Sequence, residues 1–136
     1  MTSLDSQWED PPATSGDGEG TPELYYETLP AFVEYVSLAF GRDLDLPTLT
    51  WCPEWWRHPE AVYRLDSLWR SWEHLRNDPA TGSSDWLRDH LDHHLPILLS
   101  INGPFKGCNP QRGHQQRDLT LPLAEPPASV YPDETT

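Results

Sequence analysis

The chain has 136 residues and a net charge of −13, with 15 Pro, 7 Trp and 2 Cys, and its length allows one domain. The acidic residues gather toward the ends, since residues 1–46 carry a net charge of −9 and residues 47–118 carry −1. There is no basic cluster to neutralise phosphates, no basic and apolar leader, and no run of about 20 apolar residues, so we expect a cytoplasmic protein without a membrane span or direct nucleic-acid binding.

Both ends of the chain have the composition of disordered segments. Residues 1–21 are acidic and rich in Pro and Gly, too polar to offset the entropy lost on ordering. Residues 109–136 form a similar, Pro-rich tail, which is either solvated or a docking peptide for another protein. The folded domain is therefore expected over residues 22–108.

The first predicted helix spans residues 28–40. Thr28 can cap it, Pro30 suits its first turn, and Gly41 suits a left-handed stop. Its apolar side chains follow helical spacing and form one stripe: Leu29, Phe32, Val33, Val36 and Phe40. An extended connector over residues 44–51 is expected next.

A second helix is predicted from Pro59, in the favoured first position, to about Asn77. Its buried face comprises Val62, Leu65, Leu68, Trp69, Trp72 and Leu75. Glu60 with Arg64, and Asp66 with Arg70, are spaced as ion pairs on its exposed side.

The third helix is predicted to begin with Ser84 as its N-cap and to bury Trp86, Leu87, Leu91 and Leu95. Pro96 removes a backbone hydrogen bond, so we expect it to kink or end the helix, with residues 97–99 as a second short segment. The predicted fold is mainly α, a small three-helix domain with an extended Trp-rich segment and disordered termini.

Histidine and cysteine residues suggest a metal site as one hypothesis. His90 and His94 are four residues apart and share a helix face, and Cys52 and Cys108 can complete a four-coordinate zinc site. His58 and His74 are further candidate ligands. The alternative is that both Cys are buried small hydrophobes and that the His residues are solvated or hydrogen-bonded. His114 falls in the tail and is expected at the surface, and a Cys52–Cys108 disulfide is not expected in the cytosol.

Six of the seven Trp lie between residues 51 and 86. Most are expected in the core, but the adjacent Trp55 and Trp56 face opposite ways in an extended segment, so one can stay exposed. With Arg57 they are the predicted partner-binding residues, because exposed Trp and Arg anchor protein interfaces. Neither a nucleophile elbow nor a phosphate loop is present, so we expect no enzymatic activity.

Four motifs carry a resemblance to a known family. They are W-C-P-E-W-W-x-H at residues 51–58, L-W-R-S-W-E at 68–73, W-L-R-D-H at 86–90 and G-P-F-K-G-C at 103–108. This pattern resembles an actinobacterial family catalogued as a domain of unknown function, whose members are products of plasmids, integrative elements and phages. The resemblance implies an accessory role in a mobile element, without a mechanism or catalytic residues.

These observations favour a non-enzymatic accessory or protein-binding module that acts through protein contacts and needs no cofactor. The acidic leader is expected to complement a basic partner or to mimic a nucleic acid. The alternative is a small zinc-binding domain with a His/Cys structural site. The identity of the protein partner and the oligomeric state stay open at this stage.

Overall fold

The computed structural model describes residues 23–131, which contain helices and no strand. The elements in chain order are α2 (Leu29–Ala39), the 3-10 turn η1 (Trp55–Arg57), α3 (Pro59–Leu75), α4 (Gly82–Trp86), the π-helical turn η2 (Leu87–Leu91) and α5 (Asp92–Leu99). The predicted mainly helical class is confirmed. The predicted acidic leader over residues 1–21 lies outside the described residues.

Helix α2 begins as its sequence predicts. The Thr28 hydroxyl oxygen accepts a hydrogen bond from the backbone N–H of Ala31 at 3.3 Å, and Pro30 lies in the first turn, where its missing N–H costs nothing. The helix ends at Phe40, whose N–H donates to the Val36 carbonyl. This cap directs the apolar stripe of α2 toward α3.

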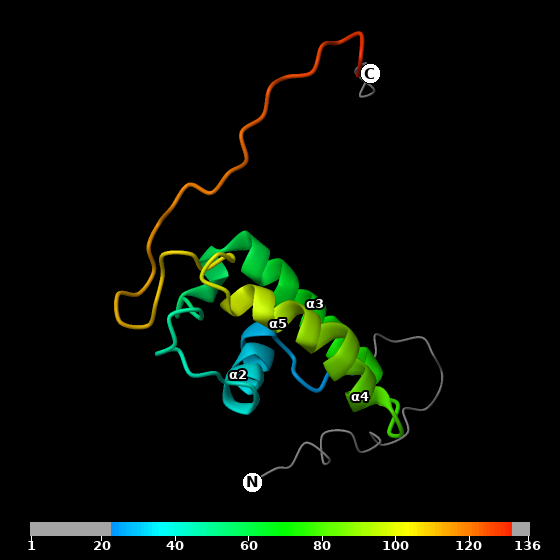
Figure 1. Cartoon of the computed structure of the whole chain (residues 1–136). Coiled ribbons are helices and arrows are strands. Elements are labelled where there is room, and N and C mark those ends of the chain that lie inside the picture. Colours follow the sequence, from blue (N-terminus) through cyan, green and yellow to red (C-terminus); the bar gives the residue numbers. More distant parts are fainter. Residues whose placement is uncertain (1–22, 132–136) are drawn as a thin grey trace.

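Helix α3 is the central element of the domain, since α2, α4 and α5 all pack against it. In Figure 1, the stretch from α4 to α5 runs alongside α3. The helix starts at Pro59 as predicted and ends at Leu75, close to the expected end. The two predicted ion pairs form on its outer side, Arg64 to Glu60 at 2.9 Å and Arg70 to Asp66 at 2.7 Å.

The third helical stretch differs from the prediction in two ways. It begins at Gly82, with Thr81 rather than Ser84 at the cap position. Pro96 lies inside α5 and does not end it, while the irregular turn is η2, upstream of the proline. The wider π-helical turn changes the direction of the backbone before the proline ring, so α5 continues to Leu99.

Two tryptophans fill the centre of the core. Trp72 and Trp86 are almost fully buried, and the Phe32 ring lies 6.1 Å and 6.3 Å from them, between α2 and the other helices. The Trp86 indole N–H donates to the Leu68 carbonyl at 3.1 Å, which satisfies a polar group that burial would otherwise leave unpaired. Trp69 is only half-buried, and its indole N–H donates to the backbone of Tyr26.

A buried ion pair holds the N-terminal segment at the far end of α3. The Glu73 carboxylate accepts hydrogen bonds from the backbone N–H groups of Tyr25 and Tyr26, both at 2.9 Å. It also lies 3.2 Å from the guanidinium of Arg76, which donates in turn to the Glu23 carbonyl. Burial of this charged pair makes it a structural link rather than a surface contact.

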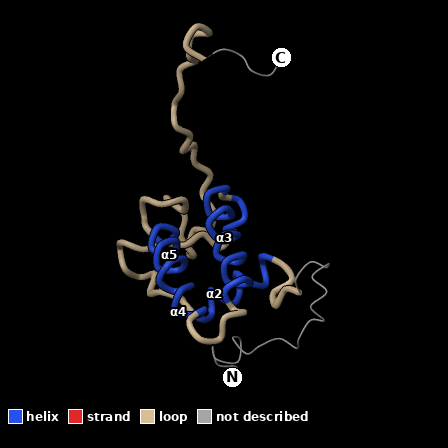
Figure 2. The backbone as a smooth tube through the Cα atoms, turned by 90° about the vertical axis from the view of Figure 1, so that its right-hand side faces the viewer, coloured by secondary structure: helices blue, strands red, loops and turns tan. Residues whose placement is uncertain are grey.

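The connector before α3 pairs with the chain that leaves α5. The N–H of Thr50 donates to the Leu99 carbonyl at 2.7 Å, and the N–H of Ile101 donates to the Thr48 carbonyl at 3.3 Å. Figure 2 shows the loops that result from this pairing at one end of the helices. The Trp-rich segment after Thr50 therefore lies beside the loop after α5. No helix among residues 23–131 is long and apolar enough to cross a membrane.

Candidate metal centre

Two loops bring two cysteines and two histidines together. Cys52 and His58 come from the segment before α3, and Cys108 and His114 come from the segment after α5. One ligand atom from each of the four residues lies within 4.8 Å of the others. In both loops five residues separate the Cys from the His, so the cluster is built from two Cys-x5-His segments.

The first segment closes through the turn η1. The N–H of Arg57 donates to the Glu54 carbonyl at 3.0 Å, and the N–H of His58 donates to the Trp55 carbonyl at 3.1 Å. These two bonds curl the backbone so that the His58 ring returns toward Cys52. Because His58 also precedes the first residue of α3, the helix itself positions one ligand.

The second segment closes through consecutive tight turns. The N–H of Lys106 donates to the Gly103 carbonyl, and the N–H of Cys108 donates to the Phe105 carbonyl at 2.9 Å. Gly107 has a φ of 89°, a conformation that side chains disfavour. The fully buried Phe105 packs against the His58 ring, with centroids 5.0 Å apart, and so anchors this loop to the other.

The distances within the cluster suit one tetrahedral zinc ion. The Sγ atom of Cys52 lies 3.5 Å from Nδ1 of His114, and that of Cys108 lies 3.7 Å from Nε2 of His58. The two ring nitrogens are 3.1 Å apart. Zinc bonds of about 2.3 Å to sulfur and about 2.0 Å to nitrogen place neighbouring tetrahedral ligands about 3.3–3.8 Å apart.

Burial shifts the pKa of two of the four side chains, Cys52 and His58. It raises the pKa of the Cys52 thiol to about 11, and the Cys108 thiol beside it adds to this rise. Burial also lowers the pKa of His58, and the neighbouring His114 lowers it further. A metal ion would reverse the first effect, because it takes thiolate and neutral imidazole as ligands.

The surroundings of the cluster orient its ligand atoms. The backbone N–H of Gln115 donates to the Cys108 sulfur at 3.2 Å. His114 places Nε2 at 3.1 Å from Oε1 of Gln116, which leaves Nδ1 directed into the cluster. The His58 ring hydrogen-bonds to the carbonyl of Pro104. Such partners fix the tautomers of metal-binding histidines.

The structure brings together only two of the four predicted metal ligands. Cys52 and Cys108 meet, but His90 and His94 lie outside the cluster, and their places are taken by His58 and His114. His94 lies on α5 with Nδ1 at 3.0 Å from Nη1 of Arg64, because α5 packs its His face against α3. Burial, and then the charge of that guanidinium, lower the pKa of His94.

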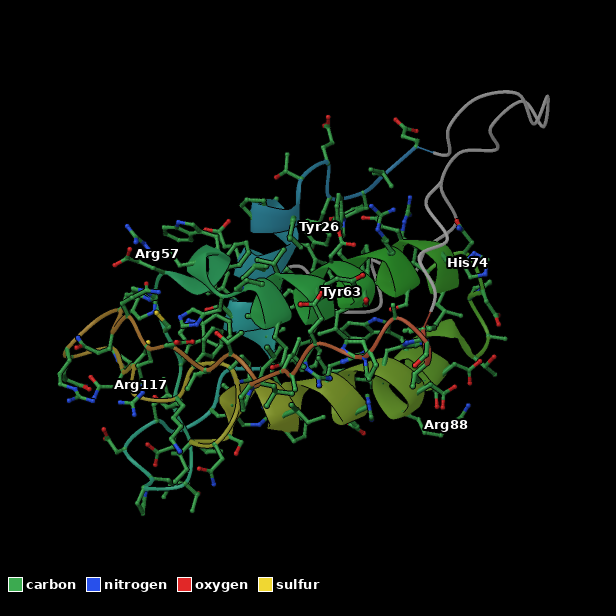
Figure 3. All side chains as sticks on the ribbon, turned by 90° about the horizontal axis from the view of Figure 1, so that it is seen from above. Tyr26, Arg57, Tyr63, His74, Arg88 and Arg117 are labelled. Carbon is green, nitrogen blue, oxygen red and sulfur yellow. The ribbon has the colours of Figure 1, made fainter. Side chains whose placement is uncertain are left out.

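The structure places His74 and His114 in different surroundings. His74 is exposed at the opposite end of the domain from Arg57, the neighbour of His58 (Figure 3). His114, expected at the surface of a tail, is half-buried, because residues 109–113 form a turn closed by a bridge between Asn109 and Gly113. The repeated Cys-x5-His spacing is the signal in the sequence that could have identified His58 and His114.

The predicted partner-binding residues lie beside this centre. Trp56 is 58% exposed, while Trp55 is half-buried, and their rings meet edge to face at 5.8 Å. Arg57 is exposed and pairs with Glu54 at 2.7 Å. The two indoles, with Trp51, line a groove between η1 and α2.

The family described as a domain of unknown function (DUF4913) matches residues 26–127. The chain therefore belongs to this family. The match includes all four residues of the cluster and continues into the tail. No curated protein and no solved structure matches the chain.

Proposed function

We propose that the chain is a small zinc-binding domain in which Cys52, His58, Cys108 and His114 hold one structural Zn²⁺. The observation that supports this is the convergence of the four ligand atoms within 4.8 Å of one another, with sulfur–nitrogen and nitrogen–nitrogen contacts of 3.1–3.9 Å that lie close to the edges of a zinc tetrahedron. Thiolate and imidazole are ligands that zinc prefers over the oxygen ligands of Mg²⁺ or Ca²⁺.

A structural role fits this site better than a catalytic one. Four protein ligands leave no open coordination position for water or substrate. The ion would join the segment before α3 to the segment after α5, in addition to the hydrogen bonds around Thr50 and the packing of Phe105 on Trp51 and His58. Metal binding would thus contribute directly to the free energy of folding of this end of the domain.

The biological role we propose is that of a non-enzymatic accessory module acting through protein contacts. The exposed Trp56 and the groove beside it support this role, because a large exposed indole is typical of an interface anchor. The resemblance of its motifs to products of actinobacterial plasmids, integrative elements and phages supports the proposal that the partner is a protein of a mobile element.

The zinc proposal is tested by elemental analysis of tag-free full-length protein purified without chelator. We expect one zinc per chain, and a melting temperature that falls when a chelator removes it. His114→Ala and Cys108→Ser should lose the metal. His94→Ala and His90→Ala are matched controls that should keep it, because neither ring belongs to the cluster.

Two results would contradict the zinc proposal. One is wild-type protein that contains no metal after zinc is supplied and shows no change in melting with chelator. The other is equal zinc content in His114→Ala and His94→Ala. Circular dichroism of each variant separates loss of a ligand from general unfolding, since α2 and α3 contain no cluster residue and should keep their helical signal.

A further inference from the structure

The tail that follows the metal centre exposes apolar side chains in an extended segment. Residues 116–131 are all exposed, without helix or strand. Residues 116, 117, 119 and 120 still line a pocket with the start of α3, and the segment beyond them runs away from the helical domain (Figures 1 and 2). Between residues 119 and 131 the large apolar side chains are 52–94% exposed: Leu119, Leu121, Leu123, Val130 and Tyr131. The family match extends to residue 127, so most of this segment belongs to the domain that defines the family.

The composition of this tail segment is typical of a peptide that binds in a groove of a protein. Pro122, Pro126 and Pro127 restrict the backbone, so the segment loses less conformational entropy on binding than an ordinary loop. Three of its leucines lie close together in the sequence, at positions 119, 121 and 123, and all three are exposed. Only Glu125 carries a charge between residues 119 and 131.

The groove beside η1 has the chemistry that receives such a segment. Its walls are aromatic and proline side chains together with Val33, Ser37 and the acidic Glu34 of α2; the aromatic and proline residues are Trp51, Trp55, Trp56, Pro53 and Pro30. The Trp55 ring contacts the exposed Trp56 ring edge to face and supports it at the groove. Aromatic-lined grooves bind Pro-rich extended peptides, because the flat ring faces pack on the pyrrolidine rings.

We propose that residues 119–131 of one copy dock in this tryptophan groove of a second copy, so that two chains exchange tails. Each chain carries one groove and one ligand segment, so a reciprocal exchange satisfies both and closes with two-fold symmetry. Beyond Thr120 the tail leads away from its own domain, so its exposed apolar side chains there are accessible to a second copy. The inference rests on the proposed binding role of Trp56, and it does not require the zinc ion.

The charge of the chain gives this association a distinctive salt dependence. Each copy carries −13, so two copies repel each other at long range, while the groove and the tail segment contribute one acidic side chain each. Salt screens that repulsion and leaves apolar burial intact. The dimer should therefore become tighter as the salt concentration rises, the opposite of an association held by ion pairs.

The test is sedimentation equilibrium of the zinc-loaded full chain over a wide concentration range, at low and high salt. We expect a monomer–dimer equilibrium that salt favours. Trp56→Ala, and separately the double change Leu121→Ser with Leu123→Ser, should weaken the dimer by at least about 30-fold, the loss typical of an interface hot spot. Leu38→Ser is the matched control, because Leu38 is 82% exposed on α2 and outside the groove.

Mixing the two defective variants makes the test specific. Trp56→Ala keeps an intact tail and the Leu121/Leu123 variant keeps an intact groove, so an equimolar mixture should form heterodimers that neither variant forms alone. A full chain that stays monomeric at all concentrations would overturn the proposal, and so would a dimer that both variants leave unchanged. Measuring zinc in every variant keeps failure here distinct from failure of the metal centre.

Discussion

The buried carboxylate of Glu73 provides a sharp test of how the N-terminal segment is held. The perturbation is Glu73→Ala, which removes the acceptor for the backbone N–H groups of Tyr25 and Tyr26 and for the guanidinium of Arg76. Both side chains of the ion pair are only 7% exposed. Water therefore cannot readily replace the missing carboxylate.

The expected magnitude follows from this burial. Removing one partner of a buried ion pair leaves an uncompensated charge and costs about 3–5 kcal/mol. The two orphaned N–H groups act in the same direction. A loss of this size should lower the melting temperature by more than about 10 °C for a domain of this length.

The assay is urea unfolding of the full-length protein, followed by circular dichroism and Trp fluorescence, with Asp66→Ala as the control. Asp66 forms an ion pair of similar length with Arg70, but that guanidinium is 75% exposed, so its loss should cost less than about 1 kcal/mol. Glu73→Ala should also speed chymotryptic cleavage after Tyr25. A difference between the two variants below about 1 kcal/mol would refute the reasoning, because the Glu73 pair would then behave as a solvated one.

Three further perturbations test other parts of the structure. Gly103→Ala should lower both the melting temperature and the zinc affinity, because a Cβ atom there would lie 2.2 Å from the Ile97 carbonyl oxygen and displace the turn that leads to the cluster. Trp72→Ala, at a fully buried position, should cost about 3–5 kcal/mol in urea unfolding, with a native-like value contradicting its place in the core. The pKa of His94 is lower in the folded protein than in the unfolded chain, so the unfolded state binds a proton at this ring more readily. The contribution of His94 to the free energy of unfolding is therefore complete above the unfolded pKa of about 6.5 and is lost as the pH falls below that value. The charged or titratable groups around the His94 ring are Arg64, His90 and His93. In His94→Gln, the free energy of unfolding should fall less steeply below that pH than it does in wild type. Parallel pH profiles for the two proteins would rule out this role.

The two ends of α3 are held by different chemistry. At its N-terminal end, His58 belongs to a cluster of thiols and imidazoles that joins two loops. At its C-terminal end, Glu73 and Arg76 hold residues 23–26 through buried hydrogen bonds. The metal proposal therefore concerns only one end of the domain, and chelation should loosen that end before the helical core.

Local sequence determines the starts of α2 and α3 and the centre of the core. Thr28 and Pro30 specify the start of α2, and Pro59 specifies the start of α3, because caps and first-turn prolines act within a few residues. The buried positions of Trp72 and Trp86 also follow from helical spacing. These features depend on neighbours in the chain, which the sequence displays directly.

Only the tertiary structure decides which polar residues meet. Cys52 and His114 are 62 positions apart and come together because the backbone at Thr50 pairs with the segment after α5. Helical spacing favours His90 and His94 instead, but the His94 ring packs against Arg64 and neither ring belongs to the cluster. Sequence spacing predicts proximity within one element, whereas a site shared between loops depends on how the elements pack, and packing energy is summed over the whole core.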